Sequence, residues 1–332
     1  MQSMPQIQQP IVKNATLFDR GGCGHIRLTG ADRVRFLHNQ TTQNIQQLSA
    51  GQGAYTVFVT STGRTIDLTT VYVEEDALHV VTSPGMAQTL YDWMDRYIFF
   101  SDKVTLANES EQTFMFSLLG EGSDDIVRKV GADAVVGQPE FSHQAASVAS
   151  AQIRVAAGSG LAISGYTVWG RRADAQTVWE AFLGAGATAG EAAGEVSRWE
   201  DLRIRQGRPA PGKELTDEDN PLEAGLWQSV SFDKGCYIGQ ETIARLNTYK
   251  GVKKRLWGLV LDKPVDVGET VWIEENKIGK VTSSTNEGGD AFALAYLRTK
   301  AGGEGIRVSV GDTTARVVSL PFVTHRYPDE VN

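Results

Sequence analysis

The strands expected after Lys254 constrain the fold of this chain most. Short runs of β-branched, aromatic and aliphatic residues follow one another here, and glycine, proline, aspartate and asparagine separate them. The runs cover residues 255–260, 270–273, 277–283, 292–297 and 307–310. Regular spacing with turn residues between the runs is typical of a small antiparallel barrel or sandwich. We therefore predict a C-terminal antiparallel β-barrel over residues 251–332.

The residues before this boundary predict a different architecture. Three strands are expected within 55–82, and a helix over 86–98 follows them, with apolar positions at spacings of three and four. A similar order returns with strands within 152–171 and a helix over 174–183. Strands followed by a packing helix, occurring twice, indicate α+β subdomains of the split βαβ, ferredoxin-like type.

The chain is therefore predicted to have three parts. The main α+β domain is discontinuous and comprises residues 1–50 and 110–250. A ferredoxin-like subdomain over residues 51–109 interrupts it, and the barrel follows. The Ala/Gly-rich segment 184–194 is predicted to be a loop.

Composition excludes several classes of function. Forty acidic residues against thirty-two basic ones give a net charge of −8, so direct nucleic-acid binding is not expected. Two distant cysteines and five scattered histidines supply neither a disulfide framework nor a metal site. The polar N-terminus and the lack of an apolar run of about 18 residues predict a cytoplasmic protein without a membrane span.

Common catalytic motifs are also missing. The sequence has no Gly-x-x-x-x-Gly-Lys-Ser/Thr phosphate loop, no Gly-x-Gly-x-x-Gly after a strand and no Gly-x-Ser-x-Gly elbow. Nucleotide binding through these loops and serine-hydrolase chemistry are therefore not predicted.

The octapeptide from Lys234 to Glu241, Lys-Gly-Cys-Tyr-Ile-Gly-Gln-Glu, places Cys236 between glycines and close to a cation. A nearby positive charge and access to water favour the thiolate. This composition predicts a reactive thiol at Cys236, assisted by Lys234. The alternative, that Cys236 is a small hydrophobic residue without chemistry, stays open.

A long tract rich in polar residues and glycine, 199–224, precedes this octapeptide. Loops beyond about 12–15 residues in a compact domain are usually functional or disordered, and the embedded Pro-Leu-Glu-Ala and the nearby Trp227 argue against disorder. We interpret the tract as the wall of a pocket. A packed surface loop without a ligand is the alternative.

The run 232–241 resembles the Lys-Gly-Cys-[Phe/Tyr]-x-Gly-Gln-Glu signature of the YgfZ family, folate-binding relatives of the glycine-cleavage T protein, an aminomethyltransferase. The resemblance extends over most of the chain up to the barrel. It also covers residues 30–37 with 40–42, the hairpin 63–67, and residues 202–204 and 220–224.

This resemblance implies a three-part ring of α+β subdomains and a C-terminal barrel around a channel that accepts tetrahydrofolate or a derivative. It further implies a role in the assembly or repair of iron–sulfur proteins, including enzymes that modify tRNA. The implied partners are iron–sulfur proteins or iron–sulfur carriers.

Candidate site residues follow from the resemblance and from the needs of a flat pterin, which are an apolar face and a few hydrogen-bonding groups. The candidates for the folate channel are Asp67, Tyr72, Arg203, Gln206, Glu223, Tyr237, Gln240 and Arg245. Arg245, or alternatively Lys250, would meet the glutamate tail of the folate. Cys236 would be the functional thiol with Lys234 beside it, and one cysteine cannot hold an iron–sulfur cluster unaided.

Two departures from the T-protein pattern bear on catalysis. Arg205 stands where the T protein has a folate-contacting carboxylate, and Leu68 follows Asp67 where the T protein has a second acid. A carboxylate beside the folate amine would steer proton transfer and stabilise a developing cation. The departures therefore predict that classical aminomethyl transfer is lost.

Three functions remain open from the sequence. The first is a tetrahydrofolate-binding accessory protein for iron–sulfur enzymes. The second is a folate-dependent aminomethyltransferase or other one-carbon transferase of the T-protein type. The third is a binding scaffold in which Cys236 is inert.

Overall fold

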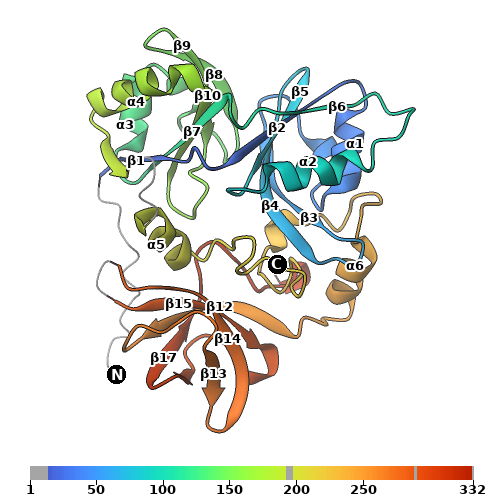
Figure 1. Ribbon diagram of the computed structural model, residues 1–332, viewed down its shortest axis with the longest axis vertical. Coiled ribbons are helices and arrows are strands. Elements are labelled where there is room, and N and C mark those ends of the chain that lie inside the picture. The colour runs from blue at the N-terminus through green and yellow to red at the C-terminus, as the bar shows by residue number, and fades with distance from the viewer. Residues whose placement is uncertain (1–13, 192–196, 288–289, 331–332) are drawn as a thin grey trace.

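The computed structural model describes residues 14–191, 197–287 and 290–330, and its strands form three sheets (Figure 1). Two open sheets occupy the upper half of Figure 1, and a closed barrel lies below them. The α+β architecture with a C-terminal antiparallel barrel is therefore confirmed. Across the described residues, no helix combines the length and apolar character needed to cross a membrane.

The N-terminal half contributes a five-stranded antiparallel sheet in the order β3-β4-β5-β2-β6. Its strands are β2 (Gly24–Thr29), β3 (Gly53–Val59), β4 (Thr65–Val73), β5 (Ala77–Thr82) and β6 (Thr105–Asn108). Helices α1 (Arg33–Gln40) and α2 (Ala87–Asp95) share a hydrophobic core with one face of this sheet. Because side chains alternate along a strand, the opposite face is free to contact the second sheet.

The strand pairing of this unit extends beyond the predicted inserted subdomain, residues 51–109, whose boundaries stay a prediction. β2 pairs with β5 and β6, so strand pairing groups residues 24–108, whereas the inserted subdomain was predicted to start at residue 51. Partners far apart in the sequence leave no local signal of their pairing. The predicted hairpin and helix lie where expected, as β3, β4 and α2.

The second sheet has six strands in the order β11-β1-β7-β10-β9-β8. Its strands are β1 (Thr16–Asp19), β7 (Thr113–Leu119), β8 (His143–Val148), β9 (Ala151–Ala157), β10 (Gly165–Arg171) and β11 (Thr188–Glu191). Helices α3 (Ser123–Lys129) and α4 (Ala175–Gly184) pack against it. The loop predicted over 184–194 contains β11, which pairs in parallel with β1. Residues 192–194 of that predicted loop lie outside the described residues.

The barrel closes in the order β12-β15-β14-β13-β16-β17. Its strands are β12 (Lys254–Leu261), β13 (Thr270–Ile273), β14 (Asn276–Thr285), β15 (Phe292–Arg298), β16 (Arg307–Val310) and β17 (Thr313–Val318). Five of them match the five predicted runs, and β17 is an additional strand.

The segment between the sheets and the barrel contains two helices, α5 (Ser197–Gln206) and α6 (Gln240–Thr248). The tract 199–224 is therefore not a continuous loop, because its first part is α5. The buried side chains of Leu202, Arg203, Ile204 and Gln206 point in several directions, so α5 lacks the one-sided apolar pattern of a surface helix. Single-turn 3-10 helices occur at residues 45–47, 133–135, 172–174, 227–229, 299–301 and 328–330.

Candidate ligand pocket

A cavity of about 620 Å³ lies where the two open sheets meet α5 and the loop that follows it. Its aromatic and apolar wall includes Phe18, Tyr55, Tyr72, Met115, Phe141 and Trp199. Its charged residues are Asp19, Arg20, Arg172, Glu200, Arg203, Arg208 and Lys213. Five cations therefore face two carboxylates, although the whole chain carries a net charge of −8. The pocket is suited to a partly aromatic, anionic ligand.

Arg20 is fixed by its neighbours in the pocket. Its guanidinium carbon lies 3.4 Å from the centre of the Trp199 ring, and Nη2 donates a hydrogen bond to Cys23 Sγ at 3.5 Å. Burial lowers the pKa of Arg20, while the interaction with Cys23 acts in the opposite direction. A guanidinium held on an aromatic face is oriented before any ligand arrives.

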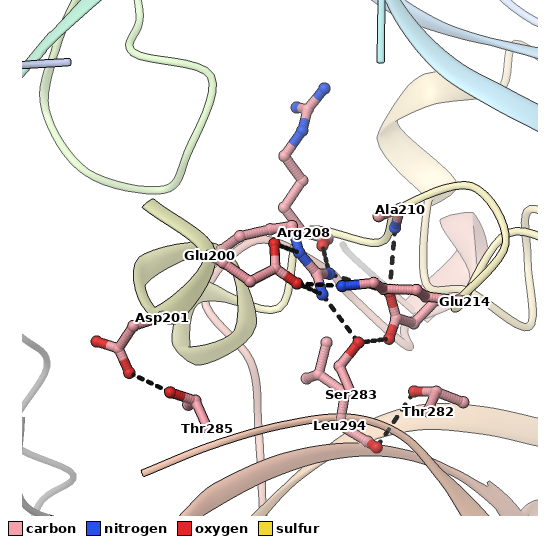
Figure 2. A network of polar contacts seen from close by, with 11 residues as sticks. Glu200, Asp201, Arg208, Ala210, Glu214, Thr282, Ser283, Thr285 and Leu294 are labelled. Carbon is pink, nitrogen blue, oxygen red and sulfur yellow. Dashed lines mark hydrogen bonds and ion pairs between the residues drawn. The ribbon is translucent and has the colours of Figure 1, made fainter. Parts of the chain in front are cut away.

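Arg208 is oriented in a similar way. Its Nη1 donates to the carbonyl of Gly160 at 3.0 Å, and its guanidinium lies 5.2 Å from the Tyr55 ring and 5.1 Å from the Phe322 ring. In Figure 2 its side chain points away from the polar network below it. Arg208 therefore directs a cation into the pocket region, and within the described residues it forms no ion pair with a carboxylate.

Arg203 belongs to a polar network with Glu200, Glu214 and Ser283, three residues that Figure 2 labels. Nε and Nη2 bind both oxygens of Glu200 at 2.8 and 2.7 Å. Nη1 donates to Glu214 Oε2 at 3.0 Å and to the carbonyl of Arg208 at 2.7 Å, and Nη2 also reaches Ser283 Oγ at 2.8 Å. All five donors of the guanidinium are used, so Arg203 ties α5 and its following loop to the barrel.

The carboxylate of Glu200 remains at the wall of the pocket. Burial opposes its ionisation, but hydrogen bonds from Arg203 and Lys213 outweigh this effect and lower the pKa of Glu200. Glu200 is therefore an anion at neutral pH, held between two cations.

Asp67, on β4, lies directly behind the wall. Its Oδ2 accepts the N–H of Ser83, a residue that lines the pocket, at 2.9 Å. Its Oδ1 is buried and has no hydrogen-bond partner within the described part of the chain. Burial raises the pKa of Asp67 to about 6, against the hydrogen bonds from Ser83. A carboxyl that titrates near neutral pH can exchange a proton with a bound ligand.

Of the predicted channel residues, Tyr72 and Arg203 line the pocket. The Tyr72 ring stacks on Trp169 with centroids 4.5 Å apart and an angle of 25°. Burial raises the pKa of Tyr72, so its hydroxyl stays neutral. Asp67 contributes from behind the wall. These three are the predicted residues that the fold brings together.

Gln206 and Glu223 are buried but do not line the pocket. The backbone carbonyl of Gln206 accepts the N–H of Phe322 at 2.9 Å. Glu223 Oε2 accepts the N–H of Asn220 at 3.2 Å, and burial raises the pKa of this carboxyl. Glu223 lies beside the barrel, because its backbone carbonyl accepts the N–H of Leu256 on β12 at 3.1 Å.

Tyr237, Gln240 and Arg245 also lie outside the pocket lining. Gln240 Oε1 accepts the N–H of Tyr237 at 3.1 Å, which closes the turn before α6. Arg245 is exposed on α6, where its nearest carboxylate is Glu241 at 3.8 Å. Their assignment to folate binding stays a prediction.

Lys234 and Cys236 have different surroundings from each other. Lys234 Nζ donates to the carbonyls of His38, Thr41 and Gln43 at 2.5, 2.6 and 2.8 Å. Burial lowers the pKa of Lys234 to about 7, while three carbonyl acceptors favour the charged amine. All three N–H donors of the Lys234 amine therefore bind carbonyls at the end of α1 and in the residues after it. Cys236, in contrast, is exposed and lies outside the pocket.

Arg20 and Cys23 line the pocket but were not predicted from the sequence, whereas Trp199 and Arg208 lie in the tract 199–224 that was interpreted as a pocket wall without being named as candidate residues. The run Arg20-Gly21-Gly22-Cys23 has the same combination of cation, glycine and cysteine as the octapeptide, and this similarity is the signal that could have identified it. Among the described residues no group of His, Cys, Asp and Glu side chains could hold a metal ion.

The three sheets and their central pocket define an α+β protein with a C-terminal barrel and an anion-compatible ligand site. Models of two known domains match the sequence: the GCVT N-terminal domain matches residues 6–234, and the glycine cleavage T-protein C-terminal barrel domain matches residues 254–324. This protein belongs to the glycine cleavage T-protein family.

Individual relatives agree with this membership. The chain is 43% identical over 312 residues to "Putative transferase At1g60990, chloroplastic" of Arabidopsis thaliana, a match that covers 93% of this chain and 71% of the relative. It is 25% identical to an aminomethyltransferase of Halalkalibacterium halodurans, over 96% of this chain and 90% of that protein.

A solved structure shows the same fold. The glycine cleavage system aminomethyltransferase T from Bartonella henselae superposes with a TM-score of 0.80, at 22% identity, over 95% of this chain and 88% of that one. The T-protein relationship implied by the octapeptide is therefore confirmed, whereas the narrower grouping with YgfZ stays a prediction.

Proposed function

We propose that the protein binds tetrahydrofolate or a derivative in the central pocket and transfers a one-carbon unit to or from it. One observation carries the proposal: the pocket combines aromatic walls with an excess of cations in an otherwise acidic chain. A folate needs this combination, because its pterin and benzoyl rings require aromatic contacts and its glutamate carries carboxylates.

The described residues fit such a ligand. Tyr72 and Trp199 offer ring faces, and Arg20 and Arg208 offer guanidinium groups for carboxylates. Asp67 accepts the N–H of Ser83 from behind the wall and would position this lining residue against the folate. The folate supplies the nitrogen that carries the one-carbon unit, and the protein supplies binding, orientation and exclusion of water.

The contacts of Arg205 bear on the prediction that classical aminomethyl transfer is lost. Arg205 Nε donates to Asp201 at 2.7 Å and its Nη2 to carbonyls of Asp290 and Glu287, so its side chain is directed to the barrel. Glu200 lines the pocket from the same helix, and Asp67 lies behind the opposite wall. The pocket therefore retains carboxyl groups despite the two departures, which supports a transferase over a protein without chemistry.

Calorimetric titration with tetrahydrofolate tests binding, and incubation with aminomethyl or methyl donors tests transfer. We expect one class of binding site and formation of methylene- or methyl-tetrahydrofolate detected by chromatography. A protein that binds no reduced folate would contradict the proposal. Binding without transfer from any donor would favour the accessory function instead.

The accessory function in iron–sulfur protein maintenance, in the manner of the YgfZ family, is a second proposal. The observation that favours it is the exposure of the Cys236 thiol, which a partner protein could reach. Cys236→Ser should then abolish support of an iron–sulfur enzyme in cells while folate binding is unchanged. Unchanged support of that enzyme would exclude a role for this thiol.

A further inference from the structure

Cys23 is the other cysteine of the chain, and it lies where two cavities meet. It is 6% exposed and lines the central pocket. A second cavity of about 790 Å³ shares Gly21, Gly22, Cys23 and Arg172 with that pocket. The thiol therefore belongs to the wall of both spaces and lies within the site proposed for the folate.

The surroundings of Cys23 suit a sulfur nucleophile. Arg20 Nη2 donates to Sγ at 3.5 Å, and Trp199 holds this guanidinium in place. On its other side the thiol packs in a cluster with Tyr72, Met115 and Trp169. A fixed cation next to sulfur stabilises negative charge during attack, and the apolar cluster keeps water from competing.

An unsatisfied polar group in the pocket wall independently indicates a ligand. The Tyr55 hydroxyl belongs to a lining residue that is 7% exposed, and it makes no well-aligned hydrogen bond within the described residues, although the Arg208 guanidinium lies close to it. Such a group costs about 1–3 kcal/mol unless a bound molecule satisfies it.

We propose that Cys23 accepts the one-carbon unit of a methylene-bearing reduced folate as a covalent N–CH2–S adduct; this inference rests on the proposed folate function. Cys23 Sγ attacks the methylene carbon, and a carbon–sulfur bond forms. The bond from that carbon to one folate nitrogen breaks, and this nitrogen receives the thiol proton. The carbon keeps its oxidation level, so no oxidant or reductant is needed.

The adduct can be observed directly by 13C NMR. Wild-type protein, Cys23→Ala and Cys236→Ala are each mixed with tetrahydrofolate and 13C-formaldehyde, which form labelled methylene-tetrahydrofolate. We expect an N–CH2–S resonance with wild type and with Cys236→Ala, and loss of this resonance with Cys23→Ala. Cys236→Ala is the matched control, because it removes the exposed thiol that lies outside the pocket.

Binding of methylene-tetrahydrofolate, measured by calorimetry on the same samples, separates the two proposals. Binding to wild type without an N–CH2–S resonance would overturn the role of Cys23 and leave the folate function intact. A resonance that persists in Cys23→Ala would also overturn it. No binding at all would refute the folate function itself. If Cys23→Ala does not fold, Cys23→Ser keeps the side-chain volume and is tested in the same way.

Discussion

The central pocket and the signature segment, residues 232–241, differ in whether their polar groups have hydrogen-bond partners. In the signature segment, Lys234 donates to three carbonyls and the Ile238 N–H donates to Asn39 at 3.1 Å. In and behind the pocket wall, the Tyr55 hydroxyl and Asp67 Oδ1 make no well-aligned hydrogen bond in the described part of the chain. Buried polar groups are normally satisfied. The comparison indicates that the hydrogen bonds of the signature segment hold the end of α1 in place. At the pocket, polar groups remain available to hydrogen-bond a ligand.

The largest effect should come from Lys234→Ala. This change leaves three backbone carbonyls without their donor, so we expect the free energy of unfolding to fall by about 3 kcal/mol. Urea denaturation measures the loss. Tetrahydrofolate affinity of the folded fraction should change little, because Lys234 does not line the pocket.

Lys253→Ala is the matched control, because Lys253 is exposed and the same charge is removed. It should leave stability unchanged. If Lys234→Ala were as stable as this control but had lost transfer activity, Lys234 would be catalytic, as predicted from the sequence, and the comparison between the two regions would fail.

The barrel and the local elements could be predicted because their signals lie within short windows. Alternation and turn residues identified five barrel strands, and the spacing of apolar residues identified α2. Strand β11 was missed because its partner β1 lies at the other end of the domain. The helix α5 was missed because it buries Arg203 and Gln206 as well as apolar residues, which hides the usual periodicity.

The candidate site was predicted only in part for a related reason. Arg203 and Asp67 were predicted because they lie in segments that resemble the T protein, and Tyr72 was predicted because a flat pterin needs an aromatic or apolar face. Arg20 and Arg208 come from separate loops, and only the fold brings them to one cavity. A positive charge in the sequence does not identify an arginine as a pocket residue, since most arginines are solvated at the surface.

A second prediction concerns the charge of Asp67. Its folded pKa of about 6 lies above the unfolded value of 3.8, so the folded state binds more protons between these two pH values. Stability therefore falls as pH rises through this window, by about 2–3 kcal/mol for the full shift. Asp67→Asn should be more stable than wild type at pH 7 and equally stable near pH 3.5. It should also lose transfer activity if this carboxyl moves a proton.

Denaturation at a series of pH values checks this dependence. Asp233→Asn makes the same substitution at an exposed position of the signature segment, and its stability difference from wild type should not vary in the same window. An identical pH profile for Asp67→Asn and wild type would show that burial does not shift the pKa of Asp67. Asp67 would then no longer support the difference between the pocket and the signature segment.

The smallest effect is expected for Arg208→Met, which keeps the length of the side chain but removes its charge. Losing one charged hydrogen-bonding group should weaken tetrahydrofolate binding by about 2 kcal/mol, or roughly 30-fold, in calorimetry. Arg208→Lys should recover part of the affinity, because a charge remains while the planar fork is lost. Arg307→Met removes an exposed barrel arginine and should bind like wild type. Equal losses from both methionine variants would mean that net charge, rather than the pocket, governs affinity.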